Sequence, residues 1–186
     1  WITAATALLN NGMAIDEMGP ASSPMEEAVM RSIAQFMGLG DDASGILCHG
    51  GTLANLTALL AARQCQSQRD EWREGTTEKY AVLVSEQAHY CVDRAVRVMG
   101  WGEEGTIHVP VDASHRIRPE ALETAFAEAQ SKGLKVLSVV GSACTTSTGA
   151  FDDLNALADF ATSKGLWFHV DGAHGAAQIF SKQHRK

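Results

Sequence analysis

The feature that most constrains the fold is an alternation of short apolar segments with longer amphipathic ones. Apolar runs at residues 80–84, 135–140 and 166–171 are each five or six residues long, and segments with helical periodicity lie between them. Strands joined through helices need crossover connections, which make neighbouring strands parallel. The sequence therefore predicts an α/β fold whose mostly parallel central sheet carries helices on both faces.

The first fifty residues show helix signals followed by a strand signal. Ser23, Pro24 and Glu26 have the spacing of a capping box with proline at the first helical position, and Gly38 is expected to end that helix. A short apolar run at residues 45–48 predicts a strand. This part of the chain is therefore expected to contain one amphipathic helix and one strand.

The remaining elements repeat the same pattern. We expect Pro119 to open a helix and Asp152 to cap another one, which Gly165 ends. In parallel sheets, ligands bind at the carboxyl ends of the strands, and the polar residues considered below follow such ends. The other predicted elements are helices at residues 53–63 and 88–99 and a strand at residues 107–110.

Composition excludes several classes of protein. With 186 residues, 45% hydrophobic and 20% charged, the chain has the make-up of one globular domain with a core. The formal net charge is −7 and the basic residues are scattered, which argues against nucleic acid as a partner. No apolar run approaches the roughly 20 residues that span a bilayer, and the four cysteines lack metal-ligand spacing. We expect a cytoplasmic protein without a metal site or a membrane partner.

The turn Gly50-Gly51-Thr52 joins a predicted strand to a predicted helix and is a candidate anion site. Glycines permit close backbone approach, and a helix N-terminus offers unpaired N–H groups and a positive dipole end to a group such as phosphate. The chain has no Gly-x-Gly-x-x-Gly motif for a dinucleotide and no nucleotide-triphosphate loop. A tight connection without any ligand explains the two glycines equally well.

Asp171 ends an apolar strand, and the small residues Gly172 and Ala173 follow it. A carboxylate at such a position is costly unless a cationic or hydrogen-bond-donating group meets it. A protonated pyridine nitrogen is one such partner, and the charge pair keeps the ring an electron sink. The alternative is that Asp171 caps the next helix.

Two further polar groups follow strand ends. His89 comes after the strand at residues 80–84, where an imidazole could stack on a flat ring or move protons. A partly buried, hydrogen-bonded histidine is the alternative. Residues 145–147, Thr-Thr-Ser, follow the strand at residues 135–140 and supply hydroxyls at the same edge, although such residues also favour plain turns. Neither group identifies a function by itself.

The order and separation of these motifs resemble one family. Gly-Gly-Thr at a helix start, Ser-x-x-x-His, Thr-Thr-Ser-x-Gly-x-x-Asp and His-Val-Asp-Gly-Ala-His stand at residues 50–52, 85–89, 145–152 and 169–174. Together they resemble the fold-type I decarboxylases that depend on pyridoxal 5′-phosphate (PLP), a group that includes glutamate, aromatic L-amino-acid and L-2,4-diaminobutyrate decarboxylases. The resemblance covers nearly the whole chain and includes residues 51–63.

The resemblance implies a PLP-transferase large domain and assigns roles to individual residues. Gly51 and Thr52 would hold the phosphate of the PLP cofactor. Asp171 would pair with its pyridine nitrogen. The cofactor contacts would therefore come from a helix start and a strand end that are far apart in the sequence.

The remaining roles implied by the resemblance concern the ring of the cofactor. His89 would stack on one face of the ring and assist protonation as the catalytic residue, and Ala173 would pack against the other face. Thr146 would hydrogen-bond near the ring or its carboxylate side. Asp152 matches a family position that supports the Thr-rich loop, and His174 stands where relatives often carry an aromatic residue, so no role is assigned to it.

The chain departs from the family in one respect. The family's cofactor-bearing lysine directly follows a histidine well downstream of the Asp171 motif, and Lys182 and Lys186 lie too soon after Asp171. We therefore assign no catalytic lysine. Residues 1–186 are expected to be a partial PLP-binding large domain, without the N-terminal start, the lysine segment and the C-terminal small domain. A first residue other than methionine agrees with that expectation.

The implied activity is decarboxylation of an L-amino acid to the corresponding amine and CO2, by a carboxy-lyase that works as a homodimer. An aminotransferase, a cysteine desulfurase or a carbon–carbon lyase of the same fold type is the alternative, since Asp171 and the phosphate turn would serve all of them. The histidine motif and the Thr-Thr-Ser run favour the decarboxylase. A fragment without the lysine is expected to be inactive by itself, and the sequence leaves the amino-acid substrate open.

Overall fold

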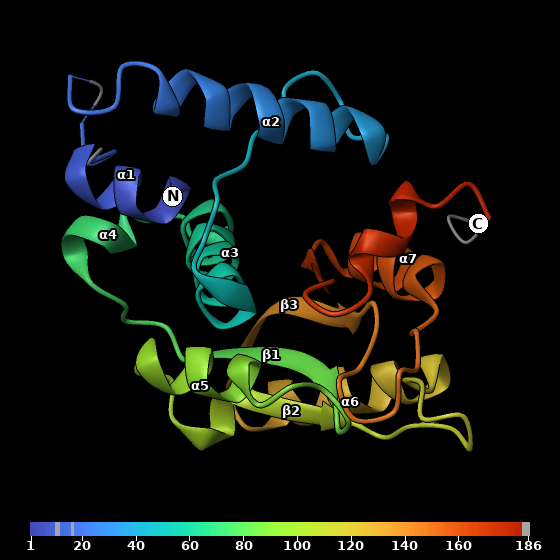
Figure 1. The fold of residues 1–186 in the computed structure, drawn as a ribbon. Coiled ribbons are helices and arrows are strands. Elements are labelled where there is room, and N and C mark those ends of the chain that lie inside the picture. The colour runs from blue at the N-terminus through green and yellow to red at the C-terminus, as the bar shows by residue number, and fades with distance from the viewer. Residues whose placement is uncertain (10–11, 16, 184–186) are drawn as a thin grey trace. The chain divides into compact units, whose positions relative to one another are not determined.

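The computed structural model describes residues 1–9, 12–15 and 17–183 (Figure 1). The chain divides into two compact units, Trp1–Cys48 and His49–Lys186. The second unit contains the sheet and every residue to which the resemblance assigns a role.

The first unit contains two helices, α1 (Ile2–Leu9) and α2 (Ser22–Phe36). Gly38 follows α2 with a φ of +75°, a left-handed conformation that glycine adopts without strain. The predicted helix and its glycine stop are therefore confirmed.

Two local predictions in this unit are wrong. No side chain caps α2, whose N-cap is Ala21, and Ser23 already lies inside the helix. The Glu26 carboxylate instead accepts the backbone N–H of Leu47 at 2.6 Å, a contact across 21 residues that a local pattern does not encode. Residues 45–48 pair with no strand in the described part of the chain, and an apolar run without a partner strand has no ladder to join.

The second unit is built on one parallel sheet. Its strands are β1 (Tyr80–Ser85), β2 (Thr106–Val109), β3 (Lys135–Ser142) and β4 (Trp167–Asp171), in the order β2-β1-β3-β4. All three pairings between neighbours are parallel. The strands end at one common edge, as the sequence predicts.

Helices cover both faces of this sheet. On one face, α3 (Gly50–Gln66) and α5 (Cys91–Val98) pack against Val82 and Val84 of β1. Shorter helical segments complete the unit. They are α4 (Glu71–Glu74), η1 (Glu103–Gly105), η2 (Pro119–Ala121) and η3 (Ala176–Phe180).

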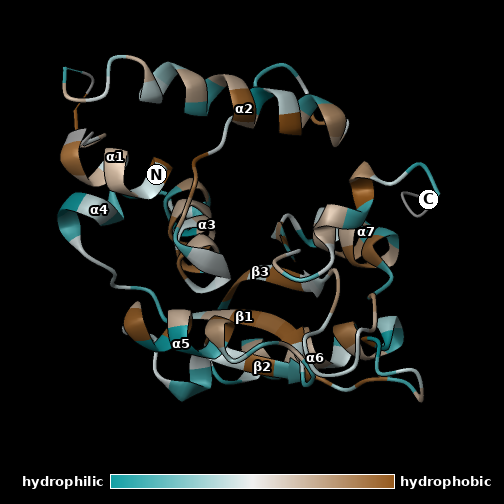
Figure 2. Cartoon of the chain, in the orientation of Figure 1, coloured by the Kyte–Doolittle hydropathy of each residue, from teal (hydrophilic) through white to brown (hydrophobic). Residues whose placement is uncertain are grey.

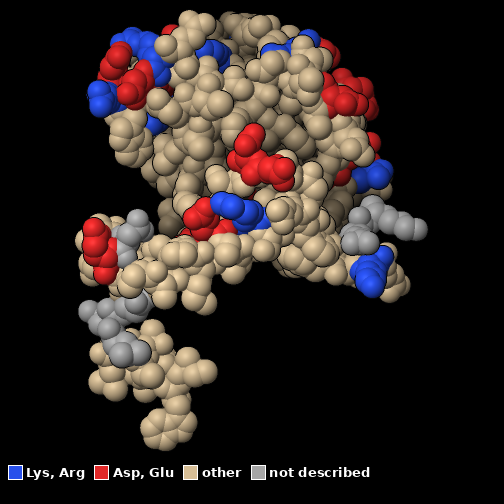
Figure 3. Space-filling view, turned by 90° about the horizontal axis from the view of Figure 1, so that it is seen from above, with Lys and Arg blue, Asp and Glu red and all other residues tan. Residues whose placement is uncertain are grey.

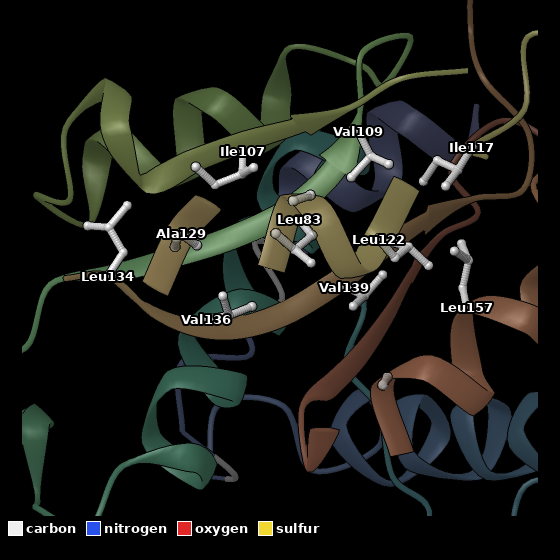
Figure 4. Close-up of a cluster of buried hydrophobic side chains, with 13 residues drawn as sticks. Leu83, Ile107, Val109, Ile117, Leu122, Ala129, Leu134, Val136, Val139 and Leu157 are labelled. Atoms are coloured by element: carbon white, nitrogen blue, oxygen red, sulfur yellow. The ribbon is translucent and has the colours of Figure 1, made fainter. Parts of the chain in front are cut away.

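On the other face, α6 (Leu122–Ser131) and α7 (Leu154–Lys164) cover Leu83 of β1 together with Val109 and Val139 of the neighbouring strands (Figure 4). Because successive side chains of a strand point to opposite faces, β1 contributes to both cores, and this requires it to be apolar throughout. Figure 2 shows the apolar colouring along β1 and β3. The predicted fold class is confirmed.

Helix starts differ most from the predictions. The helix expected at residues 88–99 begins at Cys91, because Ser85 holds the preceding turn through the N–H groups of Gln87 and Ala88. The helix after Pro119 starts as the short segment η2 before α6. Residues 50–52 form the first turn of α3 rather than a turn before it.

Asp152 does not cap α7. Its neighbour Asp153 is the N-cap and accepts the N–H of Ala156 at 3.1 Å, whereas the Asp152 carboxylate accepts the N–H groups of Ile117 and Ser142 at 2.7 and 2.8 Å. The prediction chose the wrong member of an Asp-Asp pair, since either aspartate can cap a helix. The predicted end of this helix at Gly165, in a left-handed conformation, is confirmed.

Helix length and surface charge are two further features of the structure. Within the described ranges, no helix combines the length and the apolar character needed to cross a bilayer. On the face seen in Figure 3, basic and acidic side chains are interspersed rather than gathered into a patch of one sign.

Candidate functional site

A cavity of about 200 Å³ lies at the carboxyl ends of β1, β3 and β4, beside the start of α3. This is the edge at which ligands bind in parallel sheets. All six residues that the sequence singles out for cofactor contact line the cavity. The lining residues are Gly51, Thr52, Asn55, His89, Cys91, Ser142, Cys144, Thr145, Thr146, Asp171, Ala173 and His174.

The start of α3 presents backbone donors to the cavity. No side chain caps this helix, and the first N–H groups of any α-helix have no partner within the helix. Gly51 allows the helix to come close to β4, since a Cβ at this position would lie 2.6 Å from the Cβ of Ala173. A helix start whose N–H groups have no side-chain cap is suited to an anion.

Asp171 supplies a carboxylate at the end of β4. One oxygen accepts the N–H of Ala173 at 3.1 Å, and the other lies 3.9 Å from the thiol of Cys91. Burial, and then the nearby Asp171 charge, raise the pKa of Cys91 to about 11, so the thiol keeps its proton at neutral pH. No Lys or Arg is among the described residues that line the cavity, which leaves Asp171 able to pair with a cationic ligand group.

His89 lies between β1 and α5 and is held by the helix that follows it. Its Nδ1 atom accepts the N–H of Cys91 at 3.2 Å, and its ring packs against Tyr90 with 4.1 Å between the ring centroids. Because Nδ1 accepts a hydrogen bond, the neutral imidazole carries its hydrogen on Nε2. His89 is only partly buried and can offer that donor to a ligand.

The Thr-rich loop after β3 divides its hydroxyls between two tasks. The buried Thr145 hydroxyl lies 2.6 Å from that of Thr148 and accepts the N–H of Ala150 at 3.1 Å, which fixes the loop. Thr146 is exposed and lines the cavity. The structure therefore brings Thr146 to the site, as the sequence predicts, and gives Thr145 a structural task.

The sequence analysis missed a connected set of three polar residues, of which Asn55 and Cys91 line the cavity and His169 contacts Asn55. Asn55 follows Gly51 by one helical turn, Cys91 follows His89 by two residues, and His169 precedes Asp171 by two. A spacing of four in a helix and of two in a strand places side chains on the same face, so both Asn55 and His169 could have been found from known neighbours. Cys91 gave no comparable signal, because its contact with Asp171 joins residues 80 positions apart.

Four other residues considered in the sequence analysis differ in their relation to the cavity. Asp152 is buried and binds the backbone next to β3, so it is one step removed from the site. Lys182 does not line the cavity, and Lys186 lies outside the described residues. His174, to which no role was assigned, is among the lining residues.

The donor set suits one flat ligand with an anionic group and a ring that carries a positive charge. The free N–H groups of α3 fit the anion, and the Asp171 carboxylate fits a protonated ring nitrogen. The two groups lie close together because Gly51 permits contact with Ala173. The residues present therefore fit PLP, the cofactor that the motifs imply.

Comparisons with known proteins agree on one family. The model of the pyridoxal-dependent decarboxylase conserved domain matches residues 3–186. An aromatic-L-amino-acid decarboxylase of Bacillus atrophaeus is 35% identical over 89% of this chain and 33% of its own length. An L-aspartate decarboxylase of Metarhizium robertsii is 32% identical over 96% of the chain and 36% of its own length.

Solved structures have the same fold. The glutamate decarboxylase domain of a Vibrio parahaemolyticus protein, described as diaminobutyrate-pyruvate transaminase and L-2,4-diaminobutyrate decarboxylase, superposes with a TM-score of 0.90 at 30% identity. The alignment covers 97% of this chain and 41% of that one. The chain spans about a third of the length of the curated relatives it matches.

Proposed function

The chain belongs to the pyridoxal-dependent decarboxylase family, and from that premise we propose that it takes part in PLP-dependent decarboxylation of an L-amino acid to the corresponding amine and CO2. One observation carries the proposal. Six residues from four separate parts of the sequence, chosen by their motifs, line a single cavity at the carboxyl edge of the sheet.

The residues of this chain would divide the binding of the cofactor between them. Backbone N–H groups of Gly51 and Thr52 would bind its phosphate, since α3 begins there without a cap. The Asp171 carboxylate would bind the protonated pyridine nitrogen. When bound, PLP supplies an electron sink for the bond between Cα and the departing carboxylate.

The walls of the cavity would orient the ring and handle a proton. His89 would lie against one ring face, where its Nε2–H can donate to a substrate oxygen or return a proton to carbon. Ala173 would contact the other face, and the exposed hydroxyl of Thr146 would hydrogen-bond at the ring edge. These residues bind and orient, and orientation supplies much of the rate in such reactions.

The proposal includes a larger assembly. We propose that residues 1–186 form part of a PLP-binding large domain, because the chain spans about a third of its curated relatives. A homodimer is proposed on the family resemblance. Light scattering of the complete gene product that contains this chain should give twice the mass of one complete polypeptide. A monomer with full activity would contradict the proposed homodimer.

The test starts from that complete gene product, purified with PLP. We expect a visible absorbance band of bound cofactor and release of CO2 from one class of L-amino acid in a panel that spans aromatic, acidic and diamino substrates. Asp171→Ala should lower CO2 release by roughly 100-fold. Without the carboxylate the pyridine nitrogen would lose its proton, and a neutral ring withdraws electrons poorly.

The matched control is His115→Ala, a change at an exposed residue outside the cavity, which should leave both readouts unchanged. A protein without the visible band, or an Asp171→Ala variant with normal CO2 release, would contradict the proposal. A band together with amino transfer and no CO2 release would reassign the protein to another PLP-dependent reaction.

A further inference from the structure

A buried asparagine lines the cavity and contacts the elements around it. Asn55 is only 3% exposed. Its Nδ2 atom donates to the carbonyl of Gly51 at 2.9 Å and to the sulfur of Cys91 at 3.4 Å. Its Oδ1 atom lies 2.5 Å from Nε2 of His169. One side chain thus joins the first turn of α3, the start of α5 and strand β4.

The direction of these hydrogen bonds is fixed by chemistry. Oδ1 of Asn55 can only accept, so Nε2 of His169 carries the hydrogen between them. Burial lowers the pKa of His169, which favours the neutral imidazole despite the opposing charge of Asp171. Every polar atom of the Asn55 side chain is therefore satisfied, as a buried amide requires.

The chain of contacts continues from Asn55 to the carboxylate. The sulfur of Cys91 accepts from Asn55, and its S–H donates to Oδ2 of Asp171 at 3.9 Å. The raised pKa of Cys91 means that this proton is present at neutral pH. The other oxygen of Asp171 is held by the N–H of Ala173, so both carboxylate oxygens have a donor within the protein.

We propose that Asn55 and Cys91 are positioning residues that fix the Asp171 carboxylate toward the ring of the bound cofactor and tie its placement to the phosphate-binding turn. This inference rests on the proposed function. The physical reason is that a carboxylate held by neighbouring donors loses less orientational freedom when it pairs with a ligand. Deep burial keeps Asn55 in a single arrangement.

The test uses substitutions of similar volume in the complete gene product. Cys91→Val removes the S–H donor, Cys91→Ser restores a hydroxyl donor, and Asn55→Leu removes all of the amide contacts. Cys65→Val is the matched control, because Cys65 is an exposed cysteine of α3 that does not line the cavity. Thermal unfolding without PLP identifies any variant that has lost its fold.

Two readouts besides activity report on positioning. The first is the dissociation constant for PLP, and the second is the visible circular dichroism per mole of bound cofactor, which reports how firmly an achiral ring is held in one orientation. We expect Cys91→Val to weaken PLP binding by roughly three- to tenfold and Asn55→Leu by roughly tenfold or more. Both should reduce the circular dichroism, and Cys91→Ser should restore both readouts to within about twofold.

The outcomes separate this inference from the proposed function. If the wild-type protein shows no bound PLP, the proposed function is contradicted, and so is this inference. If the wild-type protein binds PLP and both Cys91→Val and a folded Asn55→Leu match it in both readouts, the inference alone is wrong. If Asn55→Leu unfolds, the pair Cys91→Val and Cys91→Ser decides, since equal behaviour of those two variants overturns the role of the donor.

Discussion

Among single residues, Asp152 shows how a carboxylate can be structural while it stands next to a functional motif. It is 5% exposed, and its two oxygens accept two different backbone N–H groups, those of Ile117 and Ser142. Burial raises the pKa of Asp152, and the two backbone donors oppose that shift. The carboxylate therefore joins the loop before η2 to the end of β3.

This contact predicts a difference between two adjacent aspartates. Asp152→Ala leaves two buried N–H groups without a partner and should lower the free energy of unfolding by about 2–4 kcal/mol. Asp153→Ala removes only the cap of α7 and should cost about 1 kcal/mol. Urea unfolding of both variants measures the difference. Equal losses, or a larger loss for Asp153→Ala, would contradict the structural assignment.

The protonation of His169 predicts a pH dependence of stability. Burial lowers its pKa below the ordinary value of 6.5, while the unfolded chain keeps the ordinary value. Between the two values the unfolded state binds more protons, so the free energy of unfolding falls as the pH drops below about 6.5. The decline from this one group is at most about 1.4 kcal/mol per pH unit.

His169→Gln should therefore flatten part of the decline in stability between about pH 7.5 and about pH 5.5, measured by urea unfolding at both values. His115→Gln is the control, because His115 is an exposed histidine that does not line the cavity. The same decline in His169→Gln as in the wild-type protein would show that His169 is not the group responsible.

Among the elements, α3 and β4 depend on one close contact. The first turn of α3 reaches the end of β4 only because position 51 has no side chain, since a Cβ there would lie 2.6 Å from that of Ala173. The uncapped N–H groups of α3 and the carboxylate of Asp171 are brought to one cavity by this approach. The glycine of the motif is thus required for packing, independently of any ligand.

Gly51→Ala should push α3 away from β4 and weaken PLP binding by roughly tenfold or more, because overpacking of a close contact costs about 1–3 kcal/mol. The double variant Gly51→Ala with Ala173→Gly moves the methyl group across the contact and should recover most of the affinity. Gly40→Ala is the control, since a Cβ at Gly40 meets nothing within 4 Å. A titration of PLP by absorbance measures all three, and normal affinity in Gly51→Ala alone would contradict the role of this contact.

For the unit that carries the sheet, stability depends on two apolar cores, one on each face. The core under α6 and α7 includes Leu83, Val139 and Leu157, each fully buried (Figure 4). The opposite core includes Val84 and Leu59 and lies beneath the helix that begins at the cavity. The site therefore lies at the edge of a sheet that is fixed from both sides.

Leu157→Ala should lower the free energy of unfolding by about 2–5 kcal/mol, because it opens a cavity in the core that holds α7 against the sheet. Val98→Ala is the matched control, since Val98 is 65% exposed at the end of α5 and should cost less than about 0.5 kcal/mol. Urea unfolding measures both variants. A loss below about 1 kcal/mol for Leu157→Ala would show that this core contributes little to stability.

The sequence by itself determined the fold class and six of the residues that line the cavity. A strand that lies between two layers of helices must be apolar on both faces. A continuous apolar run such as residues 135–140 therefore indicates a central strand of the sheet. Gly51, His89 and Asp171 were found because each stands at or next to the end of a predicted element, at the edge where parallel sheets bind ligands. These are local signals, and local signals can be read from a sequence.

Only the tertiary structure decided how the groups that support the site pair with one another. Asn55, Cys91 and His169 form their contacts across 36 to 114 residues, and no spacing in the sequence encodes such a pairing. The same reason explains why the prediction of Asp152 as a helix cap was wrong. Its carboxylate accepts the N–H of Ile117, 35 residues earlier in the chain. A buried polar side chain forms its hydrogen bond with the group that the tertiary structure places next to it. In these cases that group lies far away in the sequence.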